Sequence, residues 1–190
     1  MKKRVYLNII LVIGIYLAFN FIKDFDYKHF FSNNENLKKT KLSGLVENNL
    51  KQGEWKSHFE TGELAEIKNF INDTLNGYHI VYEKNGEFKL LEKYNMGIQI
   101  DTFKLFSSGK LNLIEYRDSL GRLQGEFRVY VDGQISQIGH KLNDEFHGEF
   151  RSFDLKTGKL SEMYEYTKGE KSGKWIYLNT EGDTIKIIEH

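Results

Sequence analysis

The chain has 190 residues, of which 39% are hydrophobic, so its length suits one domain with or without an appendage and its composition supports a buried core. Lys and Arg together number 27, as do Asp and Glu, so no basic excess points to a nucleic-acid partner. The absence of cysteine excludes disulfides, thiolate metal sites, cysteine nucleophiles and a lipidated cysteine.

The N-terminus has the pattern of a membrane anchor. Basic residues at positions 2–4 precede an uncharged apolar run at 5–22, "VYLNIILVIGIYLAFNFI". As a helix this run reaches roughly 27 Å, close to the ~30 Å hydrocarbon core of a bilayer. The basic flank predicts a cytoplasmic N-terminus, with the rest of the chain exported to the cell-envelope or periplasmic side. The alternative is secretion after signal cleavage, although the exit at Ala18, Phe19 and Asn20 is a poor cleavage site.

The next segment mixes charged, Asn and Ser residues, which is typical of a juxtamembrane linker. Its aromatic residues, among them Phe25 and Tyr27, suit either the lipid interface or packing onto the first repeat. The sequence therefore divides into an anchor or signal sequence at 1–22, a linker at 23–44 and a repeat domain at 45–190.

The repeat domain shows six units of about 24 residues. The leading positions are Gly53, Gly77, Asp101, Gly125, Gly148 and Gly173. Two residues later each unit has a ring: Trp55, His79, Phe103, Phe127, Phe150 and Trp175. A second glycine follows: Gly62, Gly86, Gly109, Gly133, Gly158 and Gly182. A truncated earlier unit begins near Leu45.

Each unit predicts one β-hairpin, because apolar residues alternate on both sides of the second glycine. That glycine is expected to occupy the tight hairpin turn, where positive φ disfavours other residues. A looser polar turn is expected to link each unit to the next. Since one hairpin is marginal in water, the units must stack. The predicted fold is an all-β, elongated and twisted antiparallel meander of about six stacked hairpins and twelve strands, preceded by one N-terminal transmembrane helix.

A second row of large side chains lies five residues after the leading position. It projects from the sheet face opposite to the first row of rings. Two interpretations stay open: the second row is a packing ladder, or it lines a concave groove that grips a ligand. The candidate partner-binding residues are Tyr82, Phe106, Tyr130 and Phe153.

The repeat resembles MORN repeats, in the bacterial variant. The resemblance rests on "GEFRVYVDGQI", "GEFRSFDLKTGKL" and "GKWIYLNTEGD" and covers residues 45–190. The chain departs from the pattern at Asp101, at His79 and in a longer turn at 120–124. The resemblance implies a non-catalytic scaffold that binds proteins or, in other members, phospholipid, and some members are regarded as antitoxin components.

No motif for catalysis or cofactor binding stands out. The six histidines show no metal-ligand spacing, and the glycines recur at the repeat period without opening a helix. We therefore expect no enzyme activity, no cofactor and no metal. The expected function is that of a membrane-tethered module that binds a protein, peptide or envelope polymer, the alternative being an antitoxin or immunity protein that neutralises a toxin, with phospholipid binding as a third possibility.

Overall fold

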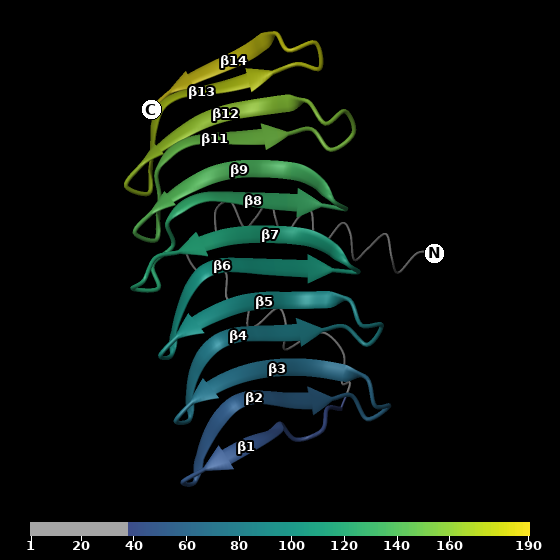
Figure 1. Cartoon of the computed structure of the whole chain (residues 1–190). Helices are drawn as coiled ribbons and strands as arrows, with labels where there is room; N and C mark the ends of the chain where they lie inside the picture. The colour runs from purple at the N-terminus through teal and green to yellow at the C-terminus, as the bar shows by residue number, and fades with distance from the viewer. Residues whose placement is uncertain (1–37) are drawn as a thin grey trace. The chain divides into compact units, whose positions relative to one another are not determined.

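The computed structural model describes residues 38–190, which form a single open sheet of 14 strands in one compact unit. Figure 1 shows the strands lying side by side in chain order. Their bounds are β1 Ser43–Glu47, β2 Leu50–His58, β3 Leu64–Ile71, β4 Thr74–Tyr82, β5 Phe88–Asn95, β6 Ile98–Ser107, β7 Lys110–Arg117, β8 Gly125–Val131, β9 Gln134–Leu142, β10 Glu145–Phe146, β11 Gly148–Phe153, β12 Leu160–Thr167, β13 Glu170–Leu178 and β14 Thr184–Glu189.

The predicted all-β antiparallel meander is confirmed for this part of the chain. Every strand pairs antiparallel with its sequence neighbours, except that the two-residue β10 pairs only with β9, so that β9 continues to β11. The twelve predicted strands are β2–β9 and β11–β14, and β1 is the truncated earlier unit, beginning at Ser43. The predicted anchor at 1–22 lies outside the described residues. Nothing between residues 38 and 190 is a helix capable of crossing a bilayer.

The hairpin turns within the units are of two kinds, and all six second glycines have positive φ. Gly109 and Gly133 each follow a residue that also has positive φ, which gives a two-residue turn. At Gly62 and Gly86 the glycine amide donates instead to the carbonyl three residues back, at 2.9 Å, in a longer turn.

The prediction of loose linking turns was wrong for most of the links. Asn48 and Asn49, like Asn143 and Asp144, form two-residue turns in which both residues have positive φ. Asn and Asp tolerate this conformation better than other residues with a Cβ. Only the β7–β8 link within the described sheet is long, and Arg117 closes it by donating to the carbonyl of Gly121 at 2.9 Å.

The leading position of every unit lies in a bulge. In β4, His79 and Leu75 pair with Lys68 and Phe70, so the outgoing strand holds two more residues than its neighbour around Gly77. All leading residues have positive φ, including Asp101 at 64°. Since Asp tolerates the left-handed region, it replaces glycine there without changing the bulge.

Replacement of Gly133 by valine is expected to lower the free energy of unfolding by about 1–2 kcal/mol or more. Its φ is 86°, a region that a β-branched residue adopts only with strain. Denaturant unfolding of the full chain measures the change. Lys156→Gln, an exposed change in another turn, should be nearly neutral. Equal effects of the two substitutions would contradict this account of the turns.

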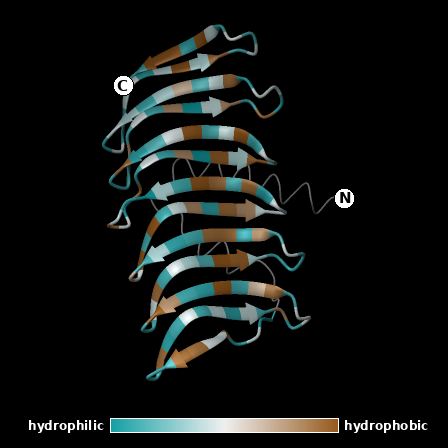
Figure 2. Cartoon of the chain, viewed as in Figure 1, coloured by the Kyte–Doolittle hydropathy of each residue, from teal (hydrophilic) through white to brown (hydrophobic). Residues whose placement is uncertain are grey.

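The two faces of the sheet differ in burial. The face that carries Trp55, called the Trp55 face, holds the most buried rings, with Phe103 1% and Phe150 0% exposed. Gly139 lies beneath the rings of Phe127 and Phe150: a Cβ there would lie 2.5 Å from Phe150 and 2.9 Å from Phe127. Figure 2 shows hydrophobic colour within the strands and hydrophilic colour at many turns.

Candidate binding surface

One row of side chains crosses the sheet on the face that carries Tyr82, called the Tyr82 face. Directly opposed residues in antiparallel strands share a face, and here each is opposed to the next without a break. Apart from Lys56, Lys104, Arg128 and Arg151, the members are aliphatic or methionine. This aliphatic row is Lys56, Ile67, Ile80, Leu91, Lys104, Ile114, Arg128, Ile138, Arg151, Met163, Ile176 and Ile187.

The predicted partner-binding residues lie next to this row, toward the hairpin turns. Each is half-buried and is opposed by an apolar residue of the return strand. The pairs are Tyr82 with Phe88, Phe106 with Leu111, Tyr130 with Ile135 and Phe153 with Leu160.

Phe88 joins two of these units into an aromatic cluster. Its ring stacks on Tyr82 with centroids 5.4 Å apart and lies 5.9 Å from Phe106. Phe88 itself is 47% exposed, so the cluster presents apolar surface to solvent. Together with the aliphatic row it gives the Tyr82 face a broad apolar area.

Three of the four cations of the aliphatic row, Lys56, Arg128 and Arg151, each pair with a glutamate two positions earlier in the same strand. Glu126 accepts from Arg128, and Glu149 accepts from Arg151, each at 2.6 Å. Residues two apart in a strand project from the same face. The sequence "GEFR" therefore encodes an ion pair between two residues on the Tyr82 face.

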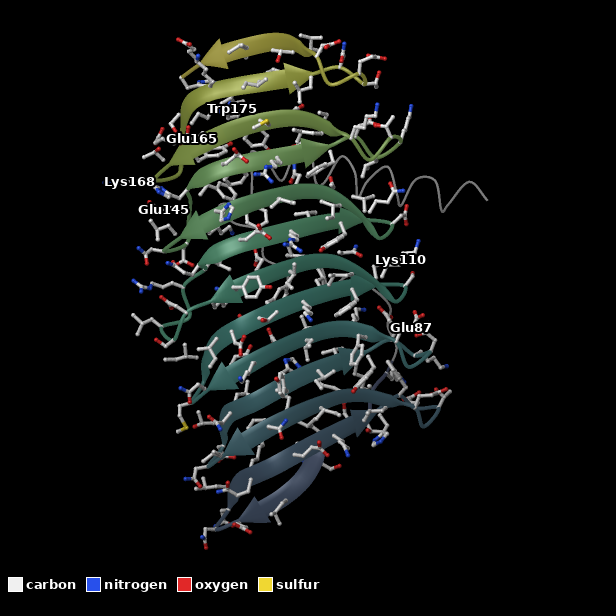
Figure 3. All side chains as sticks on the ribbon, turned by 45° about the horizontal axis from the view of Figure 1, so that its top comes forward. Glu87, Lys110, Glu145, Glu165, Lys168 and Trp175 are labelled. Atoms are coloured by element: carbon white, nitrogen blue, oxygen red, sulfur yellow. The ribbon has the colours of Figure 1, made fainter. Side chains whose placement is uncertain are left out.

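Figure 3 shows the hairpin turns and the linking turns at opposite ends of the strands. Glu87 and Lys110 lie beside hairpin turns on one side, whereas Glu145 and Lys168 lie beside linking turns on the other. Charged side chains thus border the apolar faces at both strand ends.

The Trp55 face contains a charged cluster where unit two departs from the repeat. His79 takes the place of the ring and lies between two carboxylates, with Nδ1 2.6 Å from Glu92 and Nε2 2.7 Å from Glu66. Tyr94 and Gln99 each donate to Glu92 at 3.0 Å. Glu92 is 3% exposed, so these hydrogen bonds take the place of water around its carboxyl group.

These contacts shift the ionisation of the cluster. Burial opposes the charged form of Glu66, but hydrogen bonds from His79 and Lys68 outweigh it and lower the pKa of Glu66 to about 2. Burial also opposes the imidazolium of His79, but its bonds to Glu66 and Glu92 outweigh this effect and raise the pKa of His79. The contacts therefore favour the imidazolium form of His79 and the carboxylate form of Glu66.

Neither the cluster nor the aliphatic row was found from the sequence. The row depends on register, which the bulges displace. The cluster carries a weak sequence signal, because Glu66, His79 and Glu92 follow one another at intervals of 13 residues on three successive strands. With the register known, a histidine flanked at that spacing by two glutamates would have indicated the contact.

A shallow cavity of about 290 Å³ lies at the hairpin turns of units two and three. Its lining is Glu83, Lys84, Asn85, Ser107 and Ser108. Within residues 38–190 no group of three or more His, Cys, Asp and Glu side chains is arranged to hold a metal ion.

Comparison with known proteins does not assign a family. No protein-family model matches the sequence, and no curated protein matches it. Among solved structures, the crystal structure of TarM is similar over 73% of this chain and 21% of the TarM chain, with 11% sequence identity and a TM-score of 0.31. The match spans about a fifth of TarM, and similarity at this level supports no functional argument.

Proposed function

We propose that this chain is a non-catalytic repeat module that is tethered to the membrane through residues 5–22 and binds a protein, peptide or envelope polymer through the Tyr82 face. The observation that carries the proposal is the aliphatic row, which crosses the sheet beside the aromatic cluster. Apolar surface of this extent, bordered by charge, is typical of interaction sites. The repeat resembles MORN arrays, which agrees with a binding role.

The form of the surface favours an extended ligand over a small molecule. Small-molecule sites are concave and enclose most of their ligand. The apolar members of the Tyr82 face are instead distributed over successive strands, and ion-paired Arg128 and Arg151 interrupt them. A ligand that follows the row would contact several units, with a modest contribution from each.

Combined replacement of Tyr82 and Tyr130 by alanine is expected to reduce recovery of the bound partner by about tenfold or more. Each ring supplies contact area at low conformational cost, and loss of two anchors on the order of 1 kcal/mol each gives this factor. Quantitative recovery after cross-linking in intact membranes measures it, with the amount of the chain itself kept equal.

A matched double variant serves as the control. Tyr78 and Tyr116 are 50% and 43% exposed and lie on the same face, nearer the linking turns. Their replacement by alanine should leave recovery within about twofold of wild type. If the Tyr82 and Tyr130 variant recovers as much partner as wild type, the surface assignment is wrong.

A further inference from the structure

Within residues 38–190 the sheet has two open edges, and the edge formed by β14 is unusually apolar. In β14, Ile185 is 66% and Ile187 is 52% exposed. No strand of residues 38–190 pairs with the outer edge of β14. Natural proteins protect open edges with short strands, bulges or charge, because exposed backbone groups pair readily with another strand.

The backbone groups of Ile187 point outward. The His190 amide donates to the Gly173 carbonyl at 3.0 Å, so His190 faces β13. Backbone groups alternate in direction along an antiparallel strand. The register of β13 and β14 is regular from Tyr177 opposite Lys186 to Lys174 opposite Glu189, so Ile188 and Lys186 also face β13. The N–H and C=O of Ile187 and Glu189 therefore lie on the free edge.

The number of strands decides how a second copy can add to this edge. The continuous path from β1 to β14 contains 13 strands, an odd number, so the two outer strands run in the same direction. Head-to-tail stacking of β14 on β1 of another copy would introduce a parallel pair into an antiparallel meander. A two-fold axis perpendicular to the sheet instead places β14 antiparallel to β14 of the second copy, which continues the pattern.

The sequence of β14 suits one symmetric register. Placing Ile187 opposite Ile187 of the second copy lets both residues exchange two backbone hydrogen bonds. Lys186 then lies opposite Ile188, which avoids opposing like charges, whereas a shift that centres the axis on Lys186 would oppose two lysines. In the favoured register, the aliphatic row continues from Ile176 and Ile187 directly into the row of the second copy.

We propose that the chain forms a two-fold symmetric dimer by antiparallel pairing of β14 with β14 of a second copy. The occupant of the open edge is thus another copy of this chain. The dimer is a single antiparallel sheet whose Tyr82 faces are continuous, so that a ligand bound along the aliphatic row can extend across both copies.

Single-cysteine cross-linking in the full chain tests the proposal, since the chain has no cysteine of its own. A hydrogen-bonded antiparallel pair has Cα atoms about 5.5 Å apart, within the range of disulfides. Ile187→Cys should give a covalent dimer on mild oxidation of membranes. Val46→Cys, at the β1 edge and 54% exposed, is the matched control and should stay monomeric. A Val46 dimer, or a mixed disulfide between the two variants, would overturn the proposal, as would a monomeric Ile187→Cys.

A proline variant gives a second measurement. Ile187→Pro removes only an outward N–H, so it should keep the fold and raise the dimer dissociation constant by a factor on the order of ten to one hundred, through loss of two symmetric hydrogen bonds. Sedimentation of the purified full chain in detergent measures this constant. Far-ultraviolet circular dichroism verifies the fold, and Ile188→Pro, which removes a bond to β13, should destabilise it. An unchanged constant in folded Ile187→Pro would refute β14 pairing.

Discussion

Replacement of Phe150 by alanine is expected to lower the free energy of unfolding by about 3–5 kcal/mol. Phe150 is 0% exposed and is the centre of the aromatic packing on the Trp55 face. Four rings surround it at centroid distances between 4.9 and 5.7 Å: Phe127, Phe146, Tyr164 and Tyr166. Because these rings come from two successive units, the cavity would weaken contacts between units as well as within one.

Phe88→Ala provides the matched control for Phe150→Ala, because the same atoms are removed from a ring that is 47% exposed. Its cost is expected to be about 1 kcal/mol or less, the sum of partial burial and its two ring contacts. Urea unfolding of the full chain measures both variants. Equal costs would show that the Trp55 face is not the core of the sheet.

The periodic residues were sufficient to predict the meander. Glycines and rings at a fixed spacing define hairpins, and the six second glycines all have the positive φ that tight turns require. The turn types were not predictable in the same way. A glycine satisfies both a two-residue turn, as at Gly133, and a longer turn, as at Gly86, so its presence does not distinguish them.

The bulges explain why the surface was predicted less completely than the fold. The leading glycine Gly77 lies within β4, and the bulge there shifts the register of β4 by two residues against β3. Which residues of neighbouring strands oppose each other depends on that shift. Alternation along a single strand was sufficient to place the rings two residues after the leading position and the side chains five residues after it on opposite faces. The aliphatic row joins residues of different strands, so predicting it required the register between strands.

Asp101 shows that a departure from the sequence repeat can leave the structural repeat unchanged. The third unit departs from the repeat pattern here, because aspartate takes the place of the leading glycine. The aspartate adopts φ 64°, and its carboxylate accepts from Lys93 at 3.0 Å and from Thr102 at 3.1 Å. A residue that tolerates the left-handed region and gains two local partners thus preserves the repeat.

The charged cluster around His79 should make the stability of the sheet greatest in mildly acidic solution. The pKa of Glu66 is lowered to about 2, so its contribution is complete above its ordinary pKa of 4.5 and is lost as the pH falls toward 2. The pKa of His79 is raised, so its contribution is complete below its ordinary value of 6.5 and is lost as the pH rises through the raised pKa. Both contributions are present between about pH 4.5 and 6.5.

His79→Gln removes the titrating group while keeping a side chain that can donate to one carboxylate. We expect the variant to be less stable than wild type by about 1–3 kcal/mol at pH 5.5, after allowance for partial solvent screening, with a smaller difference near pH 3 and near pH 9. Urea unfolding at the three pH values measures the difference. His140→Gln, at an exposed histidine on the other face, is the control and should show no such maximum. A wild-type advantage over His79→Gln that does not vary with pH would mean that the two glutamates do not hold an imidazolium between them.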